Sequence, residues 1–147
     1  MAGGRSYRDW VGWQKAMTLV ADIYKRCAAF PSDERFGLTS QVRRAGVSIP
    51  ASIAEGFGRN SKADSVRFLD MACGSTNEVE THLLAAELGF ADRSAIAHAV
   101  GSAIEVRRIV KGPIRGLDRS TQTGFRSPNS ELKDEPNPLS ERIHEQA

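Results

Sequence analysis

The chain has 147 residues, of which 40% are hydrophobic and 26% charged, and it carries a net charge of +2. This composition is typical of one globular domain, and the absence of a run of about 18 apolar residues excludes a transmembrane helix. The first residues also lack the apolar core of a signal peptide, so we expect a cytoplasmic protein that does not enter a membrane.

The first predicted helix runs from about Trp10 to Ala29, with Asp9 as its N-cap. Its apolar residues recur at spacings of three and four and form two neighbouring rows. The rows are Trp10, Trp13, Met17, Val20, Tyr24 and Cys27, and beside them Ala16, Ile23 and Phe30. Two rows make the wide apolar face of a packed bundle. The helix ends at Phe30, because the residue before a proline disfavours helical backbone angles.

The second predicted helix begins at Thr39, the expected N-cap, and reaches about Phe57, with Pro50 in its interior. A proline inside a helix removes one backbone hydrogen bond and costs about 3 kcal/mol. We therefore expect Pro50 to have a structural role, in a core element whose surrounding packing holds the kink. Gly58 is the expected C-terminal stop. The buried stripe is predicted to be Val42, Ala45/Gly46, Ile49 and Ile53.

Two further helices are predicted. The third starts at Ser61, its expected cap, and the fourth starts near Asp92. The core row of the third is Leu69, Ala72/Cys73, Thr76, Val79, Leu83, Ala86 and Phe90, and the row of the fourth is Ile96, Val100, Ala103, Val106 and Val110. In the row of the third helix, Leu69, Thr76, Leu83 and Phe90 follow one another at intervals of seven residues, which favours left-handed, coiled-coil-like packing. Gly112-Pro113 is expected to break or end the fourth helix, and the alternative is that Ile114 and Leu117 continue its apolar face beyond the break.

The apolar periodicity stops near residue 118. Residues 118–147 contain 4 basic and 6 acidic residues, with prolines at 128, 136 and 138, whereas residues 1–117 contain 16 basic and 12 acidic ones. We expect residues 118–147 to be a polar, largely disordered tail. Residues 1–117 are predicted to form an all-α domain, an antiparallel up-and-down four-helix bundle.

Several stretches match one known family in order and spacing. They are Tyr7–Met17, Tyr24–Pro31, Gly37–Ala45, Val47–Pro50, Ile53–Gly56, and Phe68-Leu69 with Ala72, Gly74-Ser75, Glu78, Glu80-Thr81 and Leu83. Over about residues 7–110 the chain thus resembles the four-helix-bundle proteins found within intervening sequences of bacterial large-subunit ribosomal RNA genes. Thr76 departs from the pattern, because an apolar Leu is usual there.

This family is similar to the accessory variability proteins of diversity-generating retroelements, which are homopentamers that bind nucleic acid and a reverse transcriptase. The resemblance implies that this chain is a bundle that assembles with itself, as a homopentamer. It also implies association with RNA or DNA, and with a reverse transcriptase or another protein. No cofactor and no metal are expected, because the histidines and cysteines show no ligand spacing.

Basic residues outside the apolar stripes are candidates for nucleic-acid binding. If the fourth helix continues past Gly112, Arg107, Arg108, Lys111 and Arg115 share one broad face that suits successive phosphates. A solvated helix exterior explains the same pattern. Arg59 and Lys62 flank the turn before the third helix, where backbone amides can also hold a phosphate. That turn is equally explained as a helix stop followed by a helix start.

Adjacent Arg43 and Arg44 point about 100° apart on a helix, so at most one enters the bundle easily. We expect a structural role, an interhelical or intersubunit ion pair, with Glu55, Glu78 and Glu80 as candidate partners. No set of catalytic residues is visible, so an enzyme is not expected. The sequence therefore predicts a non-enzymatic, nucleic-acid-associated oligomer that acts through basic surface residues. The alternative is a protein-interaction scaffold without intrinsic affinity for nucleic acid.

Overall fold

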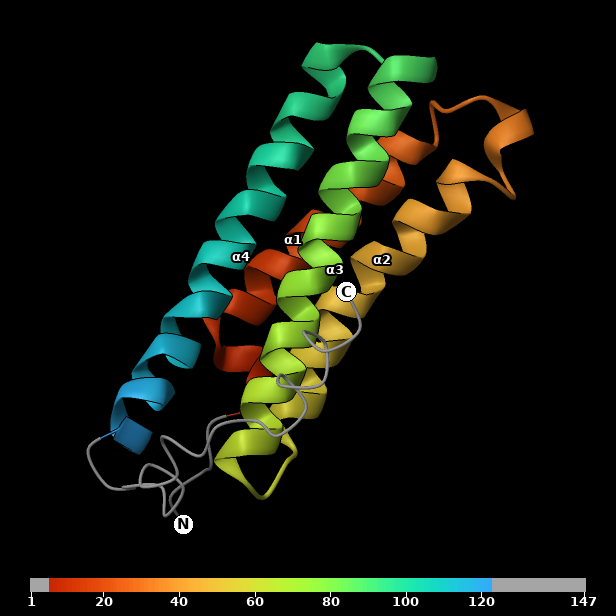
Figure 1. Ribbon diagram of the computed structural model, residues 1–147. Helices are drawn as coiled ribbons and strands as arrows, with labels where there is room; N and C mark the ends of the chain where they lie inside the picture. Colours follow the sequence, from red (N-terminus) through yellow and green to blue (C-terminus); the bar gives the residue numbers. More distant parts are fainter. Residues whose placement is uncertain (1–5, 123–147) are drawn as a thin grey trace, which may run out of the picture.

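The computed structural model describes residues 6–122, with side chains as far as residue 116. Successive helices run in alternating directions (Figure 1). They are α1 (Val11–Cys27), α2 (Leu38–Phe57), α3 (Lys62–Gly89) and α4 (Arg93–Gln122), with short 3-10 turns η1 (Tyr7–Asp9) and η2 (Ser32–Glu34). Helices α1 and α3 lie diagonally, each packed against α2 and α4. The predicted all-α, up-and-down four-helix bundle is confirmed, and the described residues contain no strand.

The core follows the predicted stripes of α2 and α3 but a different line on α1. Ala16, Leu19, Ile23 and Cys27 are the buried hydrophobic residues of α1, whereas Met17 and Tyr24 are 41% and 46% exposed. The prediction that Met17 and Tyr24 belong to the apolar core face was therefore wrong. Leu19, which that prediction left out, lies at the centre of the buried face, and this turns the outer row toward solvent.

Thr76 lies in the core of α3 at 0% exposure, in the row where apolar residues are expected. Its Oγ1 donates a hydrogen bond of 2.6 Å to the carbonyl of Cys73, one turn earlier in the same helix. Because the hydroxyl is satisfied locally, the substitution of Thr for an apolar residue leaves no unpaired polar group in the core.

Two of the predicted N-caps were wrong, for one physical reason. Asp9 does not cap α1: its carboxylate accepts from the N–H of Ser6, in a capping box that starts η1. Thr39 is buried in the first turn of α2, where a carboxylate oxygen of Glu34 accepts from the N–H of Leu38. In both cases a 3-10 turn before the helix displaces the predicted cap. The third cap was predicted correctly, since Ser61 Oγ accepts from the N–H of Asp64.

Both interior prolines, Pro50 and Pro113, lie inside continuous helices, although this was predicted only for Pro50. Pro50 lies buried inside α2, as expected, but the predicted break at Gly112-Pro113 does not occur. Pro113 is exposed, so water can take up the hydrogen bond that its ring removes, while Ile114 is 9% exposed and continues the core face. Helix α4 therefore runs through the proline to Gln122, past the predicted boundary at residue 117. Residues 123–147 of the predicted tail lie outside the described residues.

Helices α2 and α3 approach closely at Gly56. A Cβ atom added there would lie 3.2 Å from both the Cβ of Phe68 and the carbonyl oxygen of Ser65. Ser65 Oγ also donates a hydrogen bond of 2.9 Å to the carbonyl of Gly56. The missing side chain thus lets the two backbones come together just before the turn that joins them.

The two cysteines are free and buried on separate helices, which agrees with their places in the predicted apolar rows of the first and third helices. Burial raises the pKa of both thiols above the ordinary value of 9.0, although Arg43 beside Cys27 acts in the opposite direction. Both side chains therefore stay protonated at neutral pH and serve as small hydrophobic groups. Among the described residues, no helix is long and apolar enough to span a bilayer.

Candidate nucleic-acid interface

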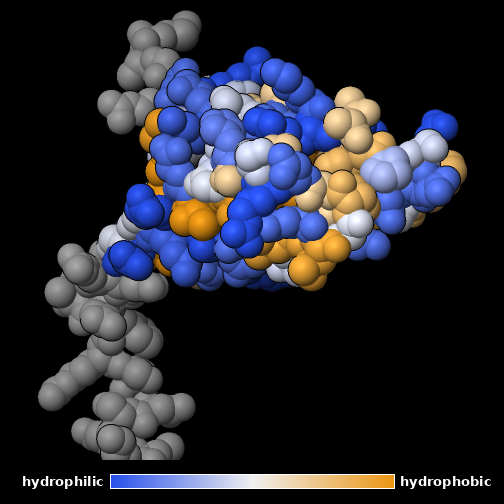
Figure 2. Space-filling model, turned by 90° about the horizontal axis from the view of Figure 1, so that it is seen from above, coloured by the Kyte–Doolittle hydropathy of each residue, from blue (hydrophilic) through white to orange (hydrophobic). Residues whose placement is uncertain are grey.

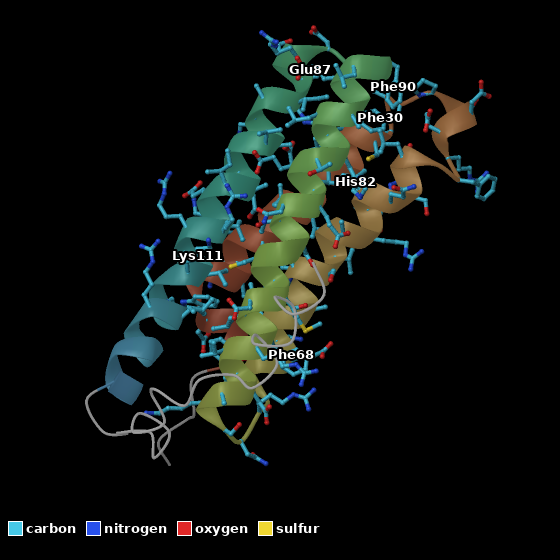
Figure 3. All side chains as sticks on the ribbon, in the orientation of Figure 1. Phe30, Phe68, His82, Glu87, Phe90 and Lys111 are labelled. Atoms are coloured by element: carbon cyan, nitrogen blue, oxygen red, sulfur yellow. The ribbon has the colours of Figure 1, made fainter. Side chains whose placement is uncertain are left out.

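The basic residues of α4 are arranged by the uninterrupted course of that helix. Val106, Val110 and Ile114 face the core, and the turns between them place Arg108, Lys111 and Arg115 on the outer side, where all three are exposed. Figure 3 shows Lys111 pointing away from the bundle. We call Arg108, Lys111 and Arg115 the α4 basic face.

Arg107 is not part of this face, although the sequence grouped it there. Its Nη1 donates to Asn77 Oδ1 at 2.6 Å and to Glu80 Oε2 at 2.9 Å, both on α3. The Arg107 and Glu80 side chains are only 24% and 27% exposed. The pair links α3 to α4, so the interhelical ion pair predicted for Glu80 exists, but with Arg107 as its partner. Arg107 is thus committed within the bundle, and its predicted role as a phosphate ligand needs correction.

This placement predicts different outcomes for two adjacent arginines. Arg107→Gln is expected to lower the free energy of unfolding by about 1–2 kcal/mol, because Glu80 loses its charged partner. Arg108→Gln is expected to leave stability unchanged and to weaken RNA binding about fivefold near 0.15 M salt, the effect of one lost phosphate contact. Urea unfolding and a mobility-shift titration measure the two effects. Stronger loss of RNA binding in Arg107→Gln than in Arg108→Gln would contradict the assignment.

Arg59 and Lys62 lie at the turn between α2 and α3, at the same end of the bundle as the C-terminal end of α4 (Figure 1). Arg59 lies over the ring of Phe68 at 4.3 Å, and its Nη2 is 3.8 Å from Glu55 Oε2. Glu55 therefore pairs with Arg59, one turn further along, and not with Arg43 or Arg44. Both Arg59 and Lys62 are exposed, so each adds one positive charge to the surface at this end of the bundle, but the two do not form a continuous basic face.

Arg43 and Arg44 divide as expected, but without the predicted ion pairs. Arg43 is half-buried, with its guanidinium 4.8 Å from the centre of the Tyr24 ring. Arg44 is exposed and lines a hollow of about 440 Å³ between α2 and α3, together with Glu78 and His82. Within the described residues, neither arginine comes within 4.0 Å of a carboxylate oxygen. The ion pairs predicted for them with Glu55, Glu78 or Glu80 are therefore wrong within the bundle. Glu55 pairs with Arg59 and Glu80 with Arg107, and Glu78 lines the same hollow as Arg44 without coming within 4.0 Å of its guanidinium.

A second hollow, of about 630 Å³, lies between α1, the segment after η2, and α2, and the sequence reasoning missed it. Its walls include Tyr24, Arg35 and Phe36. The signal was present in the adjacent Arg35 and Phe36, a cation and an aromatic ring in a short connection. Tyr24, however, lies on α1, and it joins Arg35 and Phe36 in one hollow only because α1 and α2 pack together.

The described part of the chain places no three His, Cys, Asp or Glu side chains together in a way that could hold a metal ion. Guanidinium and ammonium groups, aromatic rings and carboxylates are among the groups exposed on the described surface. Such groups bind anions and flat rings through charge and stacking.

A family model described as 23S rRNA-intervening sequence protein matches residues 8–112. Among solved structures, the chain is similar to a protein of unknown function from the S23 ribosomal protein family of Bacteroides thetaiotaomicron. That comparison has a TM-score of 0.64 and 25% identity, and covers 71% of this chain and 99% of the other. A search of curated proteins found no match.

Proposed function

The chain belongs to the family of 23S rRNA-intervening sequence proteins, and we propose that it is a non-enzymatic bundle that associates with structured RNA as a homo-oligomer. The family description connects these proteins with ribosomal RNA, which makes RNA the nucleic acid to test first. A bundle of this kind binds through surface charge and shape and needs no reacting group.

The observation that carries this proposal is the α4 basic face. Arg108, Lys111 and Arg115 project from one continuous helix, and within the described residues no carboxylate oxygen lies within 4.0 Å of them. Cations spaced along a helix can contact successive phosphates of an RNA backbone, which gives binding that depends on salt and tolerates many sequences.

Exposed apolar side chains support assembly. On α3, Met71 and Leu84 are 49% and 45% exposed. Figure 2, which looks down on one end of the bundle, shows apolar surface exposed between polar areas. Copies that cover such surface on one another would bring several α4 basic faces into one particle, so that weak contacts act together. A subunit count of five is implied by the family resemblance alone.

The test is light scattering after size exclusion, with and without a structured RNA, at about 0.05 M and about 0.15 M salt. We expect a discrete multiple of the 16.0 kDa chain that gains mass with RNA at low salt and loses it as salt rises. A monomer would overturn the assembly proposal. An oligomer that ignores RNA at low salt would favour the protein-interaction scaffold, and turnover in a nuclease or phosphatase screen would overturn the non-enzymatic assignment.

A further inference from the structure

The hollow on the other side of the bundle from the α3–α4 contact has a composition of its own. We call it the α1–α2 groove. It is lined by Tyr24 from α1, by Arg35 and Phe36 from the segment after η2, and by Arg43, Arg44 and Val47 from α2. The segment that carries Arg35 and Phe36 projects from the bundle between α1 and α2 (Figure 1). The volume of about 630 Å³ lies within the range of about 300–1,000 Å³ that is usual for small-ligand sites.

The charge of the groove is positive. Three guanidinium groups line it, and no carboxylate of the described residues does. Nε of Arg43 is buried and has no hydrogen-bond partner among the described residues. An anionic ligand in the groove would accept charge-assisted hydrogen bonds from the guanidinium groups that line it. The groove therefore fits an anion, and the phosphate group is the anion that arginine recognises with two parallel hydrogen bonds.

The aromatic rings in the groove alternate with these cations. The guanidinium of Arg43 lies 4.8 Å from the centre of the Tyr24 ring, and that of Arg35 lies 5.5 Å from the centre of the Phe36 ring. Phe36 is 89% exposed, so its ring is free of the bundle core and open to a partner. Rings and guanidinium planes at this spacing are surfaces on which a nucleobase stacks.

We infer that the α1–α2 groove binds an unpaired nucleotide of single-stranded RNA, with the base stacked on Phe36 or Tyr24 and the phosphate held by Arg35, Arg43 and Arg44. A base inside a duplex is already stacked between its neighbours and cannot enter the groove. An acidic peptide would satisfy the arginines but offers no flat ring at each charge, so the alternation of rings and guanidiniums favours nucleotides. This site is separate from the α4 basic face and would give the protein a preference for unpaired segments of a structured RNA.

The test is fluorescence polarisation with two labelled probes, a single-stranded oligoadenylate of about 10 nucleotides and an RNA duplex of the same length. Phe36→Ala is expected to weaken binding of the single strand about tenfold, the usual effect of losing one stacked base, and to leave duplex binding unchanged. Phe36→Trp, which keeps a flat ring, is expected to retain the affinity. Arg35→Gln is expected to weaken binding of the single strand about fourfold near 0.15 M salt.

Two matched controls exist in the same chain. Leu88→Ala removes an apolar side chain that is 91% exposed, which matches the 89% exposure of Phe36. Leu88 lies on α3 and does not line the groove. Arg67→Gln removes one exposed charge from α3, as Arg35→Gln does from the groove. Equal single-strand affinities for Phe36→Ala and Leu88→Ala would overturn the inference.

Other outcomes identify another occupant. If Phe36→Ala lowers the molar mass in light scattering, the groove is a contact between copies and the inference fails. If an acidic peptide displaces the single strand with equal affinity, the groove is a peptide site and the inference also fails. The two proposals separate cleanly. If the protein binds the duplex and Phe36→Ala has no effect on the single strand, only the proposal for the α1–α2 groove is overturned. If the protein binds the single strand through Phe36 but does not bind the duplex, only the proposal for the α4 basic face is overturned.

Discussion

Replacing Arg108, Lys111 and Arg115 together by glutamine is expected to weaken binding to structured RNA about a hundredfold near 0.15 M salt. Each lost phosphate contact lowers the slope of log affinity against log salt by about 0.9, so three contacts per copy account for about 2.7. The fold should be unaffected, because all three side chains are exposed and the core face of α4 is carried by Val106, Val110 and Ile114. A mobility-shift titration across a salt series measures both the affinity and the slope.

The control is a second triple variant that removes the same number of positive charges from another part of the surface. Arg8, Lys25 and Arg67 are exposed on η1, α1 and α3, and replacing them by glutamine lowers the net charge by the same three units. This variant is expected to retain most of the affinity and nearly the wild-type slope. An equal loss in both triple variants would mean that RNA responds only to total charge, and the α4 basic face would not be the binding surface.

Leu83→Ala is expected to lower the free energy of unfolding by about 3 kcal/mol, within the range of about 2–5 kcal/mol for such truncations. Leu83 is 0% exposed in the C-terminal half of α3, which packs against both α2 and α4. Truncation therefore removes buried methyl groups and leaves a cavity that rigid neighbouring helices close only in part. Urea unfolding followed by circular dichroism, at one fixed protein concentration, gives the change in stability.

Leu88→Ala is the matched control for this prediction, because the same atoms are removed from the same helix at 91% exposure. Its expected effect is within about 0.5 kcal/mol of the wild type. A comparable loss in both variants would show that Leu88 is also covered, as it would be at a contact between copies. Light scattering on the Leu88→Ala variant would then reveal a change in assembly.

The core row of α3 and the cap at Ser61 were predicted correctly, because each depends on residues of one helix and its first turn. The spacing of Leu69, Thr76 and Leu83 is a property of α3 alone, and all three are buried as predicted. The Ser61 cap involves a side chain and an N–H three residues apart. The caps of α1 and α2 were predicted wrongly because each helix follows a 3-10 turn, which has a weak sequence signal. In these turns Asp9 pairs with Ser6, and Glu34 accepts from the first N–H of α2. The continuation of α4 through Pro113 was missed because a proline's cost depends on whether it faces solvent.

The sequence by itself determined the four helices, the apolar faces of α2 and α3, and the all-α class, because hydrophobic periodicity is a local property of the chain. Only the tertiary structure decided what each basic residue does. Arg107 and Arg108 are neighbours in the sequence, yet the packing of α4 on α3 turns the first toward Asn77 and Glu80 and leaves the second exposed. In the same way, Tyr24, Phe36 and Arg43 become one groove only because α1 and α2 lie side by side. The partner of a charge depends on distances between elements, and those distances are set by how the helices pack.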